Sequence, residues 1–172
     1  ISVSRFSPAL PSAMRRTGTV RTSTSVCTLF GKFSLTMPPK YGKPTGAVSV
    51  PVAKGLINAL NKEELDCLVI ELGDGIMGEY GVQEILYDKE LMGAAAAHVM
   101  CANDPVSAWG AVELFTNRFK LKVDVLSGPA TDNAVGKEFI EGQVGVKAIN
   151  ARIEHEALGR FIEQAVFTGV PA

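Results

Sequence analysis

The chain has 172 residues, of which 47% are apolar and 20% are charged. This length suits one domain of ordinary size with an extension, and the apolar fraction is typical of a globular protein that buries a core. Gly, Asp, Glu or Lys interrupts every apolar run before it reaches the roughly 18 to 20 residues that a membrane-spanning helix needs. The sequence therefore predicts no membrane span.

The formal net charge of -1 conceals a strong asymmetry along the chain. Residues 1–62 hold nine Lys or Arg and no Asp or Glu, and the first acidic residue is Glu63. The other eight basic residues and all 18 acidic residues follow, so the two parts carry about +9 and -10. We expect the basic part to contact an acidic surface, either on this domain or on another protein chain.

Residues 1–46 are rich in Ser, Thr, Pro and Arg, which is typical of an organelle transit peptide. Because the chain opens on Ile1 rather than Met, we expect it to be processed, truncated or only partly represented. Proline breaks helices and ladders alike, so this segment is predicted to form an extended basic arm; the alternative is an ordinary loop on the domain. We expect a mitochondrial or plastid protein, on the soluble side of the organelle, whose α/β domain covers residues 47–172.

The three cysteines, Cys27, Cys67 and Cys101, are far apart and form no C-x-x-C pair. Two of them, Cys67 and Cys101, sit in apolar runs, where a reduced thiol behaves as a small apolar side chain. The pattern indicates a reducing compartment and no thiolate metal site.

From residue 47 onward, apolar residues at helical spacing alternate with short apolar runs. The short runs predict buried strands over residues 67–72, 96–101, 123–127 and 146–149. The helical patterns predict helices over residues 49–65, 80–91, 103–119, 133–142 and 151–167. Strands without alternation, each followed by a helix, are typical of a parallel sheet covered on both faces. We therefore predict an α/β fold with a doubly wound, mainly parallel, Rossmann-like sheet.

The helix over 103–119 has the clearest start. Asp104 can cap it and Pro105 suits its first position. Trp109, Val112, Phe115 and Phe119 follow at helical spacing, and we expect them to face the core.

Polar residues follow each predicted strand, where folds of this class place their ligands. They are Glu71 and Asp74, then Asn103 and Asp104, then Thr131, Asp132 and Asn133, and finally Asn150. We expect Glu71, Asn103, Asp132 and Asn150 to face one crevice. The alternative is that these residues serve turns and caps, a role that fully explains Asp104.

The first strand runs into Gly73-x-Gly75-x-x-Gly78, the spacing of a dinucleotide-binding turn. Asp104 stands at the end of the next strand, although 26 residues after Gly78. Against this interpretation, the carboxylates of Glu71 and Asp74 would face the pyrophosphate. The alternative is a simple turn that binds no ligand. A nucleotide or NAD(P) is therefore one candidate cofactor.

The segment KPTGAVSVPVAKGLINALNKEELDCLVIELGDG, residues 43–75, resembles P-loop nucleotide-binding proteins of the dethiobiotin synthetase type. In that family a helix precedes a strand that ends in an acid and a Gly-rich turn. The resemblance implies that Glu71 approaches a metal ion and that Asn103 or Asn150 approaches the base. The G-x-x-x-x-G-K-[ST] loop is missing, because FGKFS and YGKPTG lack its first Gly, so we do not expect this chain alone to hydrolyse ATP.

Other catalytic patterns are absent from the sequence, including H-E-x-x-H and G-x-S-x-G. His98 is expected to be a hydrogen-bonded core residue and His155 a solvated one. The acidic body and the few aromatic residues of the arm argue against nucleic acid as a partner. The favoured hypothesis is an accessory or scaffolding subunit of a larger organellar assembly, held through the arm. The alternative is a nucleotide- or dinucleotide-binding enzyme domain that uses the carboxyl edge of the sheet.

Overall fold

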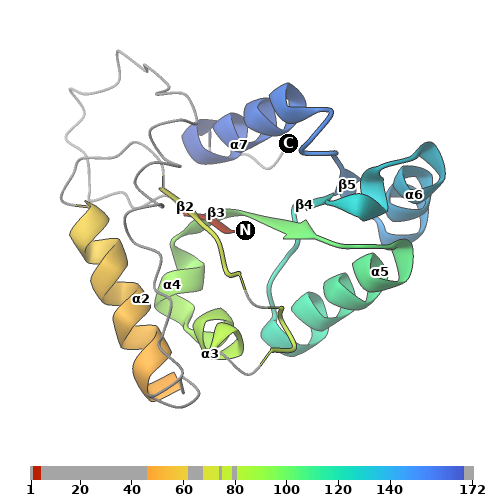
Figure 1. The fold of residues 1–172 in the computed structure, drawn as a ribbon. Coiled ribbons are helices and arrows are strands. Elements are labelled where there is room, and N and C mark those ends of the chain that lie inside the picture. Colours follow the sequence, from red (N-terminus) through yellow and green to blue (C-terminus); the bar gives the residue numbers. More distant parts are fainter. Residues whose placement is uncertain (1, 5–45, 62–67, 74, 79–80, 169–172) are drawn as a thin grey trace.

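The computed structural model describes residues 2–4, 46–61, 68–73, 75–78 and 81–168. It is an α/β fold in which a five-stranded sheet carries helices on both faces (Figure 1). The predicted α/β class is therefore confirmed. The predicted basic arm lies outside the described residues, except for a short strand at its start and the first residue of a helix at its end.

The sheet has the strand order β2-β1-β3-β4-β5. Its strands are β1 (Ser2–Ser4), β2 (Leu68–Ile70), β3 (Ala95–Cys101), β4 (Val125–Ser127) and β5 (Lys147–Ala148). Strands β3, β4 and β5 pair in parallel, as predicted, whereas β1 pairs antiparallel with both β2 and β3. Strand β2 therefore points the same way as β3, but it does not pair with it. Strand β1 was not predicted, because Ser-Val-Ser contains no apolar run.

The described helices are α2 (Gly46–Asn61), α3 (Val82–Tyr87), α4 (Lys89–Gly93), α5 (Pro105–Leu114), α6 (Ala134–Phe139) and α7 (His155–Thr168). Wide π-helical turns extend α5 through Phe115–Phe119 and α6 through Ile140–Val144, and a 3-10 turn covers Pro129–Thr131. None of the described helices is both long and apolar enough to cross a bilayer.

Two apolar clusters cover the two faces of the sheet. Leu126 of β4 packs with residues of α3, α5 and the turn after α6. Its neighbour Val125 points the other way and packs with Phe161 and Val166 of α7. Both strand residues have no exposed surface, so β4 is a central strand buried on both faces, which explains why its sequence does not alternate.

The crossovers from β2 through β3 and β4 to β5 all advance in one direction across the sheet. Right-handed crossovers that advance in one direction leave their helices on one face, and α3, α5 and α6 do share a face. Helix α7 alone, among the described helices that pack on the sheet, lies on the other face (Figure 1). When β1 is included, the order reverses once, because β2 lies on one side of β1 and β3, β4 and β5 lie on the other. In doubly wound folds such a reversal creates a ligand crevice between parallel strands, but here β1 runs antiparallel to both of its neighbours.

Two predicted helices differ from the observed ones. The first begins at Gly46, ahead of the predicted cap Ser49, and therefore contains Pro51 in its interior. The helix predicted over 80–91 is interrupted at Asp88, whose side chain accepts hydrogen bonds from the amides of Glu90 and Leu91 and so caps α4. Asp88 also pairs with Lys54 of α2 at 2.9 Å, which ties the two helices together.

The expected core position of Trp109 is wrong. Its side chain is 53% exposed, and Ala108 is fully buried in its place, since a small side chain lets α5 approach the sheet closely. Phe115 and Phe119 are buried as expected.

Gly136 provides a test of the packing between α6 and the preceding turn. A Cβ at this position would lie 2.1 Å from the carbonyl oxygen of Ala130, whereas a Cβ at Gly159 of α7 would meet nothing within 4 Å. We expect Gly136→Ala to lower the free energy of unfolding by about 3 kcal/mol or more. We expect Gly159→Ala to raise it by about 0.5 to 1 kcal/mol, because alanine favours a helix. Urea unfolding measures both, and a stable Gly136→Ala variant would contradict this packing.

Candidate functional site

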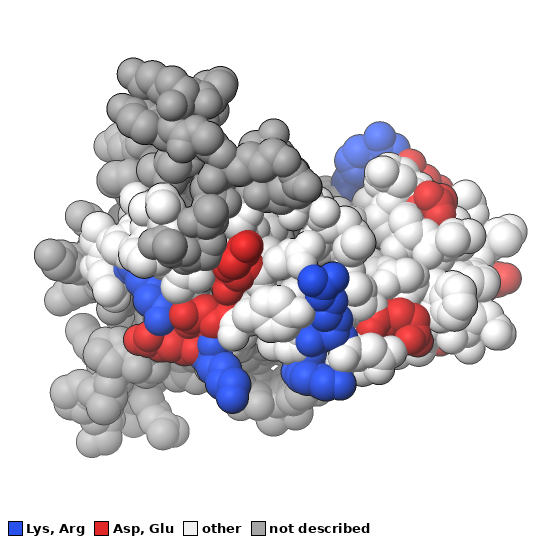
Figure 2. All heavy atoms as spheres, turned by 90° about the horizontal axis from the view of Figure 1, so that it is seen from below, with Lys and Arg blue, Asp and Glu red and all other residues white. Residues whose placement is uncertain are grey.

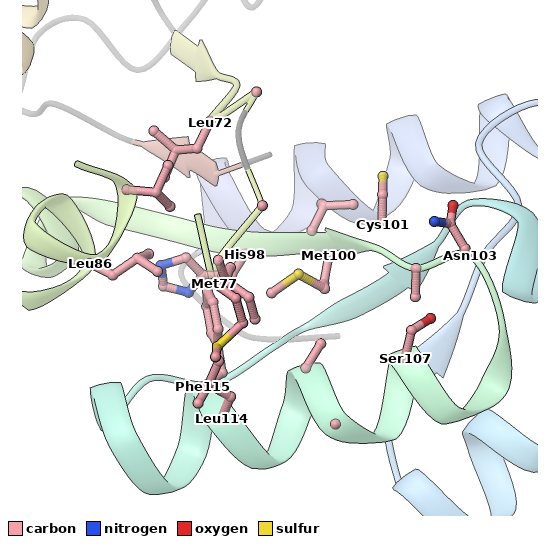
Figure 3. A pocket seen from close by; sticks show the side chains of 18 of the residues that line it. Leu72, Met77, Leu86, His98, Met100, Cys101, Asn103, Ser107, Leu114 and Phe115 are labelled. Atoms are coloured by element: carbon pink, nitrogen blue, oxygen red, sulfur yellow. The ribbon is translucent and has the colours of Figure 1, made fainter. Parts of the chain in front are cut away.

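A cavity of about 680 Å³ opens between β3, α5, α3 and the segment that follows β2 (Figure 3). This volume lies in the range of roughly 300 to 1,000 Å³ that small-molecule sites occupy. The room exists because α5 presents small residues, Gly110 and Ala111, to the cavity. Opposite them, β3 contributes Met100 and His98, which share one face of the strand.

The two ends of the cavity differ in polarity. His98, Met77, Leu86, Leu114 and Phe115 gather at one end (Figure 3). Asn103 and Ser107 lie at the other end, close to the start of α5. Among the described lining residues, Glu71 alone has an acidic side chain, and no Lys or Arg is present. The site therefore offers an apolar interior, a few polar groups and one negative charge.

His98 connects the cavity to the loop before β4. Its Nδ1 lies 3.0 Å from the carbonyl oxygen of Lys122, and its backbone amide donates to Asp124 Oδ2 at 2.9 Å. The ring also packs edge to face on Phe115, with centroids 5.8 Å apart. The side chain is only 8% exposed, and Nε2 has no hydrogen-bond partner among the described residues. The expectation of a hydrogen-bonded core histidine is confirmed for Nδ1 but not for Nε2.

Burial lowers the pKa of His98 below its usual value of 6.5. The negative charge of Asp124 and the hydrogen bond to Lys122 act in the opposite direction and offset this effect only in part. The imidazole is therefore neutral at physiological pH. His155, by contrast, is exposed at the start of α7, as expected.

Four of the predicted site residues line the cavity, namely Glu71, Gly73, Gly75 and Asn103. Asp74 lies outside the described residues. The amide of Gly78 donates to the carbonyl of Gly75 at 2.7 Å, which closes a turn. Helix α3 begins only at Val82, so its first N–H groups do not follow this turn directly. The described residues form a turn here, and dinucleotide binding stays a prediction.

Two other predicted site residues cap helices. Asp104 Oδ1 accepts from the amide of Ser107 at 2.8 Å, and Ser107 Oγ accepts from the amide of Asp104, which completes a capping box. Asn133 caps α6 by accepting from the amide of Gly136. The alternative that assigned Asp104 to a cap is thus confirmed.

The remaining predicted residues form a separate network beyond β5. Asn150 is 3% exposed and donates to Asp132 Oδ1 at 2.7 Å, while its Oδ1 accepts from the amides of Arg152 and Ile153. Thr131 is also buried, and its hydroxyl donates to the carbonyl of Gly128. Glu71 and Asn103 therefore line the same cavity, whereas Asp132 and Asn150 bond to each other elsewhere. The four residues do not share one crevice.

Glu154 completes this network at the start of α7. Its carboxylate accepts from Lys137 Nζ at 2.7 and 2.8 Å and from the amide of Asn150 at 2.9 Å. These bonds, above all the one with Lys137, lower the pKa of Glu154. Because every group here bonds to another part of the chain, this network joins α6, β5 and α7.

The described residues contain no group of three or more His, Cys, Asp or Glu side chains placed to hold a metal ion. The metal role suggested for Glu71 stays a prediction. Cys101 is exposed at the end of β3, contrary to the expectation of a buried thiol, and the other two cysteines lie outside the described residues.

The lining role of His98, Met77 and Met100 was not predicted from the sequence. One signal was present, since Gly110 and Ala111 are small residues on the helix that must cover β3. Small residues opposite large ones leave volume only if nothing else fills it, and that depends on the segment after β2. Comparison of the chain with known protein families, with curated proteins and with solved structures finds no match in any of the three.

The lowered pKa of His98 predicts how stability depends on pH. Because its pKa in the folded state lies below the unfolded value near 6.5, the folded protein binds fewer protons. Stability is therefore fully present above pH 6.5 and falls as the pH drops through that value. We expect this loss, at most about 1.4 kcal/mol per pH unit, to disappear in His98→Gln. Urea unfolding between about pH 8 and pH 5 measures it. His155→Gln is the matched control and should follow the wild type, whereas parallel curves for all three proteins would contradict a buried neutral imidazole.

Proposed function

We propose that this chain is a ligand-binding α/β domain that holds a small molecule without phosphate groups in the cavity beside β3. One observation carries the proposal: a cavity of about 680 Å³ with an apolar interior and a few polar groups at its rim lies against β3. Sites of this kind bind small molecules by burying apolar surface and orienting them with few hydrogen bonds.

The charges around the cavity favour neutral or cationic ligands. A nucleoside triphosphate or a dinucleotide needs N–H donors or cations around its phosphates. Among the described lining residues the charged group is the carboxylate of Glu71, which repels an anion. Neither of the two cofactor candidates, a nucleotide or NAD(P), fits this charge pattern through its phosphates, whereas the base and ribose alone would carry no such charge.

The finer architectural hypotheses accompany this proposal. We propose a doubly wound, Rossmann-like sheet, which is supported by α7 covering the face opposite to α5. We also propose that the arrangement of α2 before β2, with Glu71 at the end of that strand, is the one seen in proteins of the dethiobiotin synthetase type. The order of elements supports both hypotheses.

The proposal predicts selection by charge at Glu71. We expect benzylamine to bind more tightly than benzyl alcohol, and benzyl alcohol more tightly than benzoate. Because Glu71 is exposed, each step should be about two- to fivefold. Titrations followed by NMR at the amides of Met100 and Ala111 measure the three affinities. Glu71→Gln should remove the order while leaving the thermal midpoint nearly unchanged.

Glu163→Gln on the exposed side of α7 is the matched control and should keep the order of affinities. The proposal is overturned if none of the three compounds shifts the cavity amides. A large loss of stability in Glu71→Gln, without a change in binding, would assign Glu71 a structural role instead.

A second candidate function is the accessory or scaffolding subunit, in the organellar assembly that the sequence favours. One observation supports it: Val106 and Trp109 lie one turn apart on α5 with 73% and 53% of their surfaces exposed. Figure 2 views the molecule from the side of α3 and α5 and shows an area without Lys, Arg, Asp or Glu toward the α5 and α6 end, with charged side chains around its edge. Exposed aromatic and aliphatic groups with a polar rim are typical of protein interfaces.

This candidate predicts a complex that depends on Trp109. The protein isolated from its source cells should have a native mass above that of one chain, and Trp109→Ser should reduce that mass. Phe167→Ser, at a site that is equally exposed on α7, is the control and should leave the mass unchanged. A wild-type protein with the mass of a single chain would contradict the scaffolding role.

A further inference from the structure

The tautomer of His98 follows from the atom that its Nδ1 meets. That atom is the carbonyl oxygen of Lys122, at 3.0 Å, and a carbonyl oxygen can only accept a hydrogen bond. Nδ1 must therefore carry the proton. In a neutral ring Nε2 is then a bare acceptor, and the lowered pKa of His98 supports the neutral form.

The bare acceptor is in an environment that cannot satisfy it. The side chain is 8% exposed, and Nε2 has no partner among the described residues. Its neighbours at this end of the cavity are Phe115, Leu114, Leu86 and Met77, which offer no N–H or O–H group (Figure 3). A buried polar atom without a partner is costly, so a partner from outside the chain gains affinity by pairing with it.

The groups that face His98 do not provide that partner. Asp124 already accepts from the backbone amide of His98 and pairs with Lys122 Nζ at 3.1 Å. The Lys122 side chain is 72% exposed and points its charge to Asp124. Nε2 itself has almost no accessible surface, so a donor from the cavity reaches it only when a neighbouring side chain moves. Met77 is 67% exposed, and its flexible thioether can give way to an incoming group.

We propose that the ligand of this cavity is an apolar, ring-sized molecule with one hydroxyl or N–H group, and that this group donates a hydrogen bond to Nε2 of His98. The inference rests on the proposed function and names the class of ligand. The apolar body occupies the space between Met100, Leu114 and Phe115. The donor sets the orientation of the ligand, and a molecule of the same shape without a donor leaves Nε2 unpaired.

The test uses indole and benzofuran, which have the same ring shape and differ in an N–H group against an ether oxygen. Both are titrated into the full chain and followed by NMR at the amides of Met100 and Leu114. We expect indole to bind about tenfold more tightly than benzofuran. The imidazole nitrogen signal of His98 Nε2 should shift with indole and not with benzofuran.

Two variants separate the role of Nε2 from that of Nδ1. In His98→Asn the amide nitrogen can still donate to Lys122, but no atom reaches the position of Nε2, so the preference for indole should vanish. In His98→Gln the longer side chain can place an amide oxygen near that position, so part of the preference should return. Comparing the ratio of the two affinities between proteins cancels the difference in hydrophobicity of the probes.

The outcomes separate this inference from the proposed function. If indole and benzofuran bind the wild type equally, or if His98→Asn keeps the preference, the hydrogen bond to Nε2 is disproved while ligand binding stands. If neither probe shifts the cavity amides, and the three benzyl compounds also fail, the ligand-binding function itself is overturned. A tenfold preference that His98→Asn removes and His98→Gln restores in part supports the inference.

Discussion

The arrangement of the sheet depends on the burial of β4 from both sides. Val125 and Leu126 point to opposite faces and are both fully enclosed, by α7 on one side and α5 on the other. The strand can be this short because its end is held close to β3. A Cβ at Gly128, where φ is +86°, would lie 2.8 Å from the carbonyl oxygen of Ala102, so only glycine permits this approach without strain. The same junction fixes where α5 starts and thus where the cavity lies.

The polar residues at the carboxyl edge of the sheet serve two different purposes. Asn150, Asp132 and Glu154 bond to one another and to the chain, so they serve stability at the β5 end. Glu71 and Asn103 at the β2 and β3 end line the cavity. A residue can either satisfy the fold or remain free for a ligand, and hydrogen-bond partners distinguish these two uses better than position in the sequence does.

The sequence was sufficient for the parallel strands and the helices between them, because fully apolar runs and helical spacing reflect burial directly. It was not sufficient for β1, whose pairing with Val69 and Ala97 depends on segments far along the chain. Trp109 was misplaced because the helical period alone does not say which of two adjacent apolar residues faces the sheet. One part of the candidate site was predictable, because Asp104 and Pro105 mark the start of the helix that borders it. The unpaired Nε2 of His98 was not predictable, because it depends on how Lys122 and Asp124 pack against β3.

The wide turns that end α5 and α6 have a consequence for how the length of this chain can change. In each turn the carbonyl of the first residue, Phe115 or Ile140, accepts from an amide five residues later, so the turn holds one residue more than an α-helical turn. Removal of one residue from Phe115–Phe119 would restore ordinary helical spacing and rotate the following side chains by about 100° around the axis. Phe119 would then leave the core. A single deletion at either helix end therefore acts as a core mutation, although most of the side chains in these two turns face solvent.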